Sequence, residues 1–201
     1  MKNINKILSL FESYGVIGSL KIILDLIYTK LFFRRARLIR RPIFVRGKKN
    51  IKIEKGFTTG RGCRIETFTK GTLIIGENCQ INDNVDSGSV EKIIIGINVL
   101  IASKVFITDH NHGNYSEEDQ DSPNISPIER KLISKPVYIE DNVWIGEMCS
   151  ILPGVTIGEG SIIGSNSLVS KNIPSYSIAV GNPAKIIKRY DKNSKKWEKI
   201  L

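Results

Sequence analysis

The residues best suited to chemistry in this chain lie in one short stretch, residues 108–113, with the sequence TDHNHG. The stretch contains the only two histidines of the 201 residues, His110 and His112. Histidine takes up and returns a proton near neutral pH, so either side chain could act as a general base. An isolated exposed histidine is usually an ordinary surface residue. The position of this pair in the chain is what favours a catalytic role.

The elements that must position the histidines come from a six-residue repeat. A unit this short fits a short strand followed by a turn that needs Gly, Asn or Asp. Three such units close a triangular coil whose aliphatic side chains stack inward, one coil upon the next. We therefore predict a mainly β fold, a parallel β-helix. The clearest repeat positions are Ile139, Ile145, Ile151, Ile157, Ile163 and Val169.

The repeat stops between Ile107 and Ile139, after less regular units that begin near Ile53. The interval 109–136 is polar and contains several prolines and acidic residues. A long stretch of this kind in a compact domain is more often functional than idle. We expect it to protrude from the wall as a loop, with both histidines where the rigid wall meets it.

The formal net charge of +10 belongs to the N-terminal segment. Residues 1–50 contain twelve Lys or Arg but only Glu12 and Asp25 as acidic residues. Apolar residues there follow helical spacing, as in Leu20, Ile23, Leu24, Ile27 and Leu31. We predict a basic amphipathic helix whose apolar face covers the open end of the coil. Its basic face could also rest on an anionic membrane.

Several classes of protein do not fit this composition. Lys21, Asp25 and Lys30 interrupt the apolar runs, so no segment reaches the roughly 20 residues of a spanning helix. Glu12 falls where a signal peptide would need its apolar stretch. We expect a cytoplasmic protein, with peripheral contact at the inner face of the cytoplasmic membrane as an additional option. No nucleic-acid-binding motif accompanies the basic charge, so we expect no nucleic-acid partner.

The three cysteines indicate packing rather than chemistry. Cys63, Cys79 and Cys149 each occupy the fifth position of a repeat, where a small buried side chain is wanted. An odd number without CxxC spacing argues against a disulfide framework and against a zinc site. A catalytic cysteine would need an exposed, activated thiolate, which these positions do not favour.

Four motifs together carry a family resemblance: TDHNHG, NVWIG at 142–146, ILPGVTIG at 151–158 and GNPAKIIKRY at 181–190. With the repeats, they resemble the hexapeptide-repeat acyltransferases, specifically the acetyltransferases that modify sugar hydroxyls. Within that group, the whole chain looks most like the lipopolysaccharide or O-antigen O-acetyltransferases. The resemblance implies a left-handed β-helix, acetyl-CoA as the donor, no metal, and a homotrimer with its active site between neighbouring prisms.

The resemblance also assigns site residues. It implies that His110 is the catalytic base, with His112 in reserve. For the oxyanion of the reaction, we expect stabilisation by backbone N–H groups or by Trp144. It places Asn82 at the acceptor sugar with Asp83 beside it, although an Asn-Asp pair more commonly forms a turn. A further acidic acceptor contact of related enzymes does not align cleanly with residues 86–91.

For coenzyme A, the resemblance points to the C-terminal coils. A lysine can meet a phosphate as a point charge, although lysines at 185 and 188 could equally form the solvated face of a terminal helix. The implied cofactor residues are Gly146, Gly164, Ser165, Ser170, Lys171, Lys185 and Lys188. The expected organisation is a basic helical segment (1–45), a β-helix domain (46–182) with the loop 109–136, and a short C-terminal helical tail (183–201).

These observations predict an acetyl-CoA-dependent O-acetyltransferase that acts on a sugar of a bacterial surface polysaccharide or its precursor. The alternatives are an N-acetyltransferase of a nucleotide amino sugar and a non-catalytic β-helix scaffold. A metal hydratase of the γ-carbonic-anhydrase type needs three histidines, whereas this chain has two. Acyl length, and a nucleotide-sugar or lipid-linked acceptor, stay open.

Overall fold

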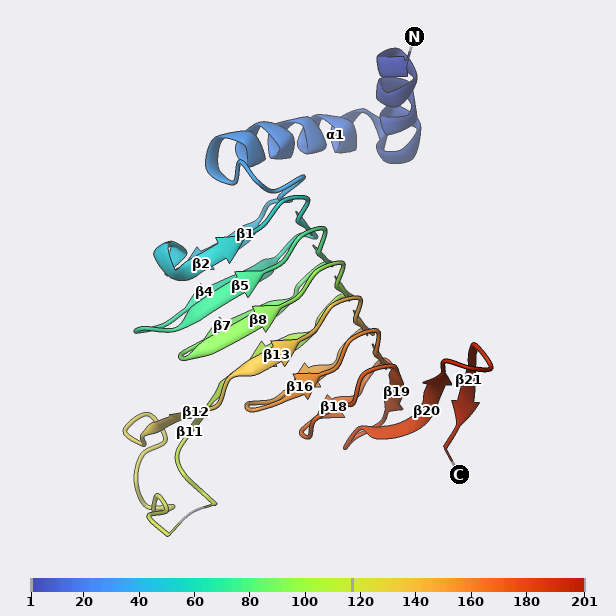
Figure 1. The fold of residues 1–201 in the computed structure, drawn as a ribbon. Helices are drawn as coiled ribbons and strands as arrows, with labels where there is room; N and C mark the ends of the chain where they lie inside the picture. The colour runs from blue at the N-terminus through green and yellow to red at the C-terminus, as the bar shows by residue number, and fades with distance from the viewer. Residues whose placement is uncertain (1, 117, 201) are drawn as a thin grey trace.

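The computed structural model describes the backbone of residues 2–116 and 118–200, and the side chains of the same residues except 2–8 and 10. The chain forms a left-handed parallel β-helix, in which coils stack along one axis (Figure 1). Helix α1 (Lys2–Phe32) lies at the N-terminal end of the stack, and a strand hairpin lies at the other end. The predicted mainly β fold with an N-terminal helix is confirmed.

Within the described residues, three parallel walls take one strand each from successive coils. The first wall contains β1 (Ile43–Arg46), β4 (Cys63–Thr67), β7 (Asp86–Ser89), β10 (Phe106–Thr108), β15 (Ser150–Ile151) and β18 (Leu168–Val169). The second wall contains β2 (Ile51–Ile53), β5 (Thr72–Ile75), β8 (Lys92–Ile95), β13 (Val137–Ile139) and β16 (Thr156–Ile157), and the short 3-10 helix η1 (Lys48–Asn50) precedes β2. The third wall contains β3 (Thr58–Thr59), β6 (Gln80–Ile81), β9 (Leu100–Ile101), β14 (Trp144–Ile145), β17 (Ile162–Ile163) and β19 (Ser177–Val180).

The six-residue repeat builds the core as predicted. Its aliphatic residues from Ile139 to Val169 are all 1% exposed or less and stack inside the prism. The corners between walls use left-handed backbone, for example at Asn84 (φ 57°) and Asn142 (φ 59°). Asparagine tolerates this conformation better than most residues, so the repeat supplies both the column of aliphatic side chains and its turns.

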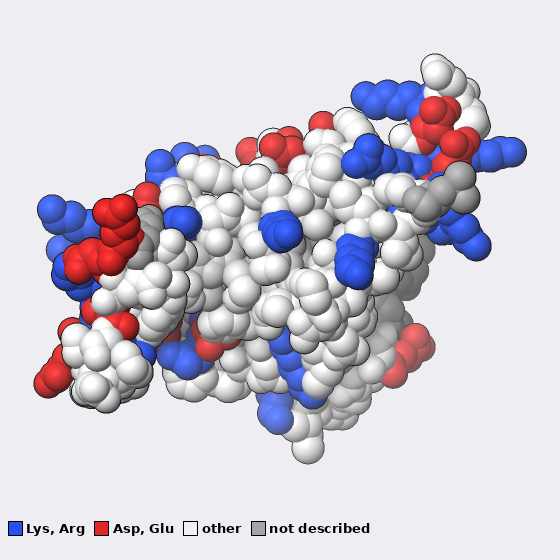
Figure 2. Space-filling view, turned by 90° about the horizontal axis from the view of Figure 1, so that it is seen from below, with Lys and Arg blue, Asp and Glu red and all other residues white. Residues whose placement is uncertain are grey.

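The interval 109–136 leaves the prism as predicted (Figure 1). The two ends of this loop form regular structure that was not predicted: β11 (His110–His112) pairs antiparallel with β12 (Leu132–Ser134). The strands on either side keep their places: β10 pairs with β7 and β15, and β13 pairs with β8 and β16. Figure 2, seen from below, shows acidic and basic side chains gathered at the lateral extremes, including the side of the loop, and a centre with few charges.

Helix α1 covers the end of the coil, but not with the face that was predicted. Among its described side chains, Ser19, Ile22, Asp25 and Thr29 are buried, all at most 6% exposed. The apolar side chains that were expected to face the coil are largely exposed, including Leu20 (52%), Leu24 (55%), Ile27 (52%) and Leu31 (68%). That prediction is wrong because the first coil offers polar partners. The helix also bends at Gly15, where φ is 64°.

Those partners are well defined. The buried carboxylate of Asp25 pairs with Arg41 and Arg61, at 2.9 and 3.0 Å. The hydroxyl of Thr29 accepts the N–H of Ile39 at 2.8 Å and donates to the carbonyl oxygen of Asp25. A polar stripe therefore anchors α1, and its apolar stripe faces outward. Among the described residues, no helix is long and apolar enough to cross a membrane.

The predicted C-terminal helix is wrong. Residues 185–199 form two antiparallel strands, β20 (Lys185–Asp191) and β21 (Lys196–Lys199), which extend the third wall from β19. After the last coil, β19 presents a free edge that a further strand can satisfy with backbone hydrogen bonds. The rings of Tyr190 and Trp197 pack across this hairpin, with centroids 5.4 Å apart.

Candidate active site

His110 stands at the corner between the first and second walls, directly after a buried carboxylate. Asp109 is fully buried, and its oxygens accept hydrogen bonds from the Ser89 hydroxyl and from the N–H groups of residues 90–92, at 2.7 to 2.9 Å. These donors belong to the preceding coil. The Nδ1 atom of His110 lies 3.0 Å from Asp109 Oδ1 and 3.2 Å from the Thr108 hydroxyl.

This environment determines the tautomer of His110. Burial raises the pKa of Asp109, but hydrogen bonds from Val90, Glu91, Ser89 and His110 outweigh it and hold that pKa below its ordinary value. Asp109 is therefore a carboxylate at neutral pH and accepts the Nδ1–H of His110. The tautomer follows from this hydrogen bond, and it leaves the lone pair on Nε2. A base with this orientation can take a proton from a hydroxyl.

The ring of His110 is held on its other sides as well. Phe68 meets it edge-on with centroids 6.1 Å apart. The side chain stays 18% exposed and can reach a substrate. His112 is exposed, with its ring 6.5 Å from that of His110. The oriented histidine is thus His110.

Asn82 and Asp83 lie at a different corner, between the third and first walls. Asn82 accepts a hydrogen bond from Gln80 Nε2 at 3.2 Å, and Asp83 accepts the N–H of Arg61 at 2.6 Å. The second contact joins Asp83 to the corresponding corner of the preceding coil. Both residues line what we call the corner cavity, of about 400 Å³. Its lining is Tyr14, Arg40, Gly60, Arg61, Gln80, Asn82, Asp83 and Ser103.

The third wall connects this corner to the C-terminal hairpin. Directly paired residues of neighbouring strands carry their side chains on the same face. Strand pairing therefore aligns one outward row, which we call the third-wall ladder: Gln80, Leu100, Trp144, Ile162, Ile178 and Lys188. Trp144 is 49% exposed in the middle of the ladder. It lies on the third wall, so the structure does not bring it to His110 within one chain.

Lys185 and Lys188 remain together although they lie on a strand rather than a helix. In a regular strand, residues three apart point to opposite faces. Here the register shifts between Ile178 and Ala179, so that Lys185 pairs with Val180 and Lys188 pairs with Ile178. This bulge places both lysines on the outward face of the wall.

The other predicted cofactor residues divide between two corners. Gly146, Gly164 and Ser165 follow third-wall strands, whereas Ser170 and Lys171 follow β18, at the corner where His110 stands. A Cβ at Gly146 would come within 2.6 Å of the Ser165 nitrogen, so this glycine permits close stacking of coils. One chain does not unite these two groups.

The cysteines have no accessible thiol. Cys63, Cys79 and Cys149 are at most 1% exposed, and burial raises the pKa of each thiol. Each thiol lies 2.9 to 3.1 Å from a backbone carbonyl oxygen. They pack the core and cannot act as nucleophiles from these positions.

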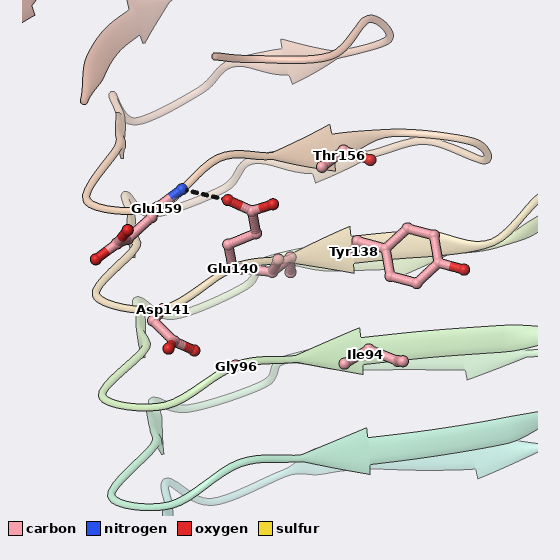
Figure 3. Close-up of a pocket in the computed structure, with 8 residues that line it drawn as sticks. Ile94, Gly96, Tyr138, Glu140, Asp141, Thr156 and Glu159 are labelled. Carbon is pink, nitrogen blue, oxygen red and sulfur yellow. Dashed lines mark hydrogen bonds between the residues drawn. The ribbon is translucent and has the colours of Figure 1, made fainter. Parts of the chain in front are cut away.

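A groove on the second wall holds none of the predicted site residues. Figure 3 shows Tyr138 and Thr156 at one side of it and Glu140, Asp141 and Glu159 at the other. Two of these carboxylates stabilise the coil by hydrogen bonds: Glu140 accepts the N–H of Glu159 at 2.8 Å, and Asp141 accepts the N–H of Ile97 at 2.7 Å. Among the described side chains, no group of three His, Cys, Asp or Glu is placed to hold a metal ion.

Sequence reasoning missed Asp109, Ser89 and Phe68. The available signal for the first was an aspartate directly before the histidine at the end of a repeat strand. Its role depends on donors 17 to 20 residues earlier in the chain, which only the stacked coils bring near.

Comparison with known proteins identifies the family of the chain. The family model described as bacterial transferase hexapeptide (six repeats) matches residues 136–171. The chain is 44% identical over 194 residues to WbbJ of Escherichia coli K12, which is named as a lipopolysaccharide biosynthesis O-acetyl transferase; the match covers 96% of this chain and 99% of that protein.

Two solved structures extend the comparison. A galactoside acetyltransferase in complex with coenzyme A is 32% identical, with a TM-score of 0.52, over 69% of this chain and 68% of that one. A hexapeptide-repeat-containing acetyltransferase from Vibrio cholerae is 25% identical, with a TM-score of 0.54, over 93% of this chain and 94% of that one.

Proposed function

The chain belongs to the hexapeptide-repeat acetyltransferases, and from this premise we propose that it transfers an acetyl group from acetyl-CoA to a sugar hydroxyl. The acceptor sugar belongs to a bacterial surface polysaccharide or its precursor, as the name of the E. coli relative supports. The observation that carries the proposal is His110, whose Nδ1 is bound by the buried Asp109 and whose Nε2 is left to act as a base.

The proposed mechanism is direct transfer. Acetyl-CoA supplies an acetyl thioester. His110 Nε2 accepts the proton of the sugar hydroxyl as the hydroxyl oxygen attacks the thioester carbonyl. Asp109 stabilises the imidazolium that forms, in the manner of a histidine–aspartate pair. His110 then returns the proton to the departing thiolate, and backbone N–H groups hold the oxyanion in between.

The third-wall ladder supports a place for coenzyme A. It offers an apolar, aromatic track through Trp144 and Ile162, and Lys185 and Lys188 stand at its C-terminal end. An extended molecule with phosphates at one end fits such a track, because lysines can meet the phosphates as point charges. The opposite end of the ladder reaches Gln80 and the corner cavity, so the acetyl group would approach the sugar from there.

We also propose a homotrimer. His110 lies at the corner between the first and second walls, whereas the ladder lies on the third wall. A head-to-tail ring of copies would set the His110 corner of one chain against the third wall of the next. In this arrangement Ser170 and Lys171 would come from the chain that supplies His110, and Gly146, Gly164 and Ser165 from its neighbour.

The outward apolar face of α1 and the basic residues beside it support peripheral contact with an anionic membrane. We place the enzyme in the cytoplasm, at the inner face of the cytoplasmic membrane. All three copies of a ring with parallel prisms would present α1 on the same side, so that the contacts would reinforce one another.

The direct test is thiol release from acetyl-CoA with a panel of sugar, nucleotide-sugar and amino-sugar acceptors. His110→Ala should reduce acceptor-dependent release about 10²-fold or more, because general base catalysis contributes on that scale. His112→Ala is the matched control and should stay near the unmodified rate. Unchanged turnover in His110→Ala would overturn the proposed base.

A mixing experiment tests the shared site. His110→Ala chains keep an intact third wall, and chains carrying Lys185→Glu with Lys188→Glu keep an intact His110 corner. Co-refolded mixtures should regain activity that neither variant has alone, because hybrid rings contain one intact corner against one intact wall. Failure of every mixture to exceed the separate variants would contradict a site built from two chains.

A further inference from the structure

We propose that the acceptor is a sugar joined through phosphate to a long apolar chain, and that its phosphate binds in a cationic cavity beneath α1. This inference rests on the proposed transfer to a sugar and adds the chemical class of the acceptor. It unites three neighbouring surfaces that the catalytic residues leave unexplained.

The cationic cavity lies where α1 meets the first coil and has a volume of about 350 Å³. Its lining is Lys21, Leu24, Asp25, Arg41, Pro42 and Arg61. The three cations exceed the single carboxylate by two charges. Asp25, 2% exposed, lies 2.9 Å from Arg41 Nε and 3.0 Å from Arg61 Nη2, and Arg61 also donates to the carbonyl oxygen of Arg41.

These contacts preorganise the two guanidinium groups. The side chains of Arg41 and Arg61 remain 42% and 37% exposed, so neither is fully used by Asp25. Fixed guanidinium groups with free donors are the arrangement that recognises phosphate oxygens. Lys21 is exposed at the rim and adds a third positive charge.

The cationic cavity adjoins the corner cavity. Arg61 lines both, and the corner cavity contains Asn82, the residue proposed to meet the sugar. Arg40 also faces the corner cavity, where it donates to the carbonyl oxygen of Thr59 at 2.8 Å. A phosphate at Arg61 would therefore be next to a sugar at Asn82.

On its other side, the cationic cavity adjoins the apolar face of α1. Leu24 lines the cavity and is also one of the exposed apolar residues of the helix. At 100° per residue, those residues lie opposite the buried stripe of Ser19, Asp25 and Thr29. The outward face comprises Val16, Ile17, Leu20, Ile23, Leu24, Ile27 and Leu31, each 39% to 72% exposed.

The order of these surfaces is apolar face of α1, cationic cavity, corner cavity. It is the covalent order of a lipid chain, a phosphate and a sugar. A nucleotide sugar would fill the second and third surfaces but would leave the apolar face exposed to water. Exposed apolar area of this extent is unfavourable unless a partner covers it. The excess positive charge beside the face matches an anionic lipid rather than a neutral one.

The test measures binding of the full chain to four probes by calorimetry: farnesyl phosphate, farnesol, inorganic phosphate and uridine diphosphate. Farnesyl phosphate should bind about tenfold more tightly than each of the others, because only it engages both the apolar face and the cations. Equal or tighter binding of uridine diphosphate would overturn the proposal, as would equal binding of farnesol.

Two charge reversals on α1 provide a matched pair. Lys21→Glu at the rim of the cavity should weaken farnesyl phosphate binding about tenfold. Lys30→Glu makes the same charge change at an exposed position outside the cavity and should alter binding less than about twofold. Equal effects of the two variants would mean that binding depends only on the overall surface charge, and would overturn the proposal that the phosphate binds in the cationic cavity.

The outcome is separable from that of the proposed function. Binding needs no acetyl-CoA, and His110→Ala should bind farnesyl phosphate as tightly as the unmodified chain. If farnesyl phosphate binds as expected but thiol release does not depend on His110, the proposed transfer mechanism is contradicted and the proposed phosphate site stands. If thiol release depends on His110 but farnesyl phosphate binds no better than the other probes, the transfer mechanism stands and the proposed phosphate site is contradicted.

Discussion

Two regions of the molecule each bury one aspartate, and the difference between them lies in the partners. Asp25, under α1, meets the cationic side chains of Arg41 and Arg61. Asp109, at the corner of the first and second walls, meets neutral donors from residues 89–92 and the ring of His110. The first carboxylate fastens a helix to a coil, and the second orients a ring.

The partners also determine the net charge around each aspartate. At Asp25 two cations more than neutralise the carboxylate, so the region keeps a positive excess. At Asp109 the backbone N–H groups bring no net charge, and the negative charge remains available to stabilise a protonated His110. A buried carboxylate therefore serves anchoring or chemistry according to whether its partners are cations or neutral donors.

The largest effect should come from Asp109→Asn. If the amide oxygen takes the place of Oδ2 and accepts the N–H groups of Glu91 and Lys92, the NH₂ group takes the place of Oδ1. There it meets His110 Nδ1 and favours the wrong tautomer, and it leaves the N–H of Val90 without an acceptor. We expect kcat for acetyl transfer to fall about 10²- to 10⁴-fold with little change in KM. Steady-state thiol release checks this, with Glu91→Gln as an exposed neighbouring control. A preserved kcat would show that the carboxylate does not orient the base.

Asp25→Ala should weaken the attachment of α1 to the coil and leave the corner at His110 unchanged. Removing the carboxylate breaks the ion pairs with Arg41 and Arg61, and a hydrogen bond to a charged group contributes about 1.5–3 kcal/mol, although the partly exposed guanidinium groups can then be hydrated. We expect hydrogen exchange to accelerate across α1 while the strands of the coil stay protected. Glu12→Ala, at an exposed position of the same helix, should leave exchange unchanged. Equal protection of α1 in both variants would mean that Asp25 does not hold the helix.

A smaller loss should follow from Thr29→Val, which keeps the shape and removes the hydroxyl. Thr29 is fully buried and accepts the N–H of Ile39, which would be left without this partner. An unsatisfied buried donor costs about 1–3 kcal/mol, so we expect the unfolding free energy to fall by this amount in denaturant titration. Ser13→Ala is the exposed control. An unchanged midpoint would show that another group replaces the hydroxyl.

The smallest effect concerns acid. Because the pKa of Asp109 is lowered in the folded chain, its contribution to stability is complete above the unfolded value of about 3.9 and is lost as pH falls through the folded value. The difference in Tm between the unmodified chain and Asp109→Asn should therefore be constant near neutral pH and shrink below about pH 4. A difference that grows on acidification would contradict a lowered pKa.

The coil could be predicted because its information is local. Residues such as Ile145 and Ile157 repeat every six positions, and each unit needs only the same unit in the next coil to be buried. The loop was predictable for the same reason, since a gap in the repeat marks where the chain leaves the wall. Both histidines could be singled out because they stand at that gap, and the choice of His110 between them came from the family resemblance.

The parts that sequence missed depend on distant partners. The spacing of Leu20, Leu24 and Ile27 indicates an apolar stripe on α1 but not that Arg61 and Ile39 would draw the opposite stripe inward. Likewise, residues 185–191 became a strand because the edge of β19 was available to pair with. Asp109 acquired its role only when the preceding coil supplied its donors.

The loop at residues 109–136 departs from the prism and returns without changing the register of β10 or β13. The coil above and the coil below therefore stack as if the excursion were absent. The part of the loop beyond the β11–β12 pair can therefore change in length and sequence without disturbing the stack, the buried Asp109 or the adjoining His110.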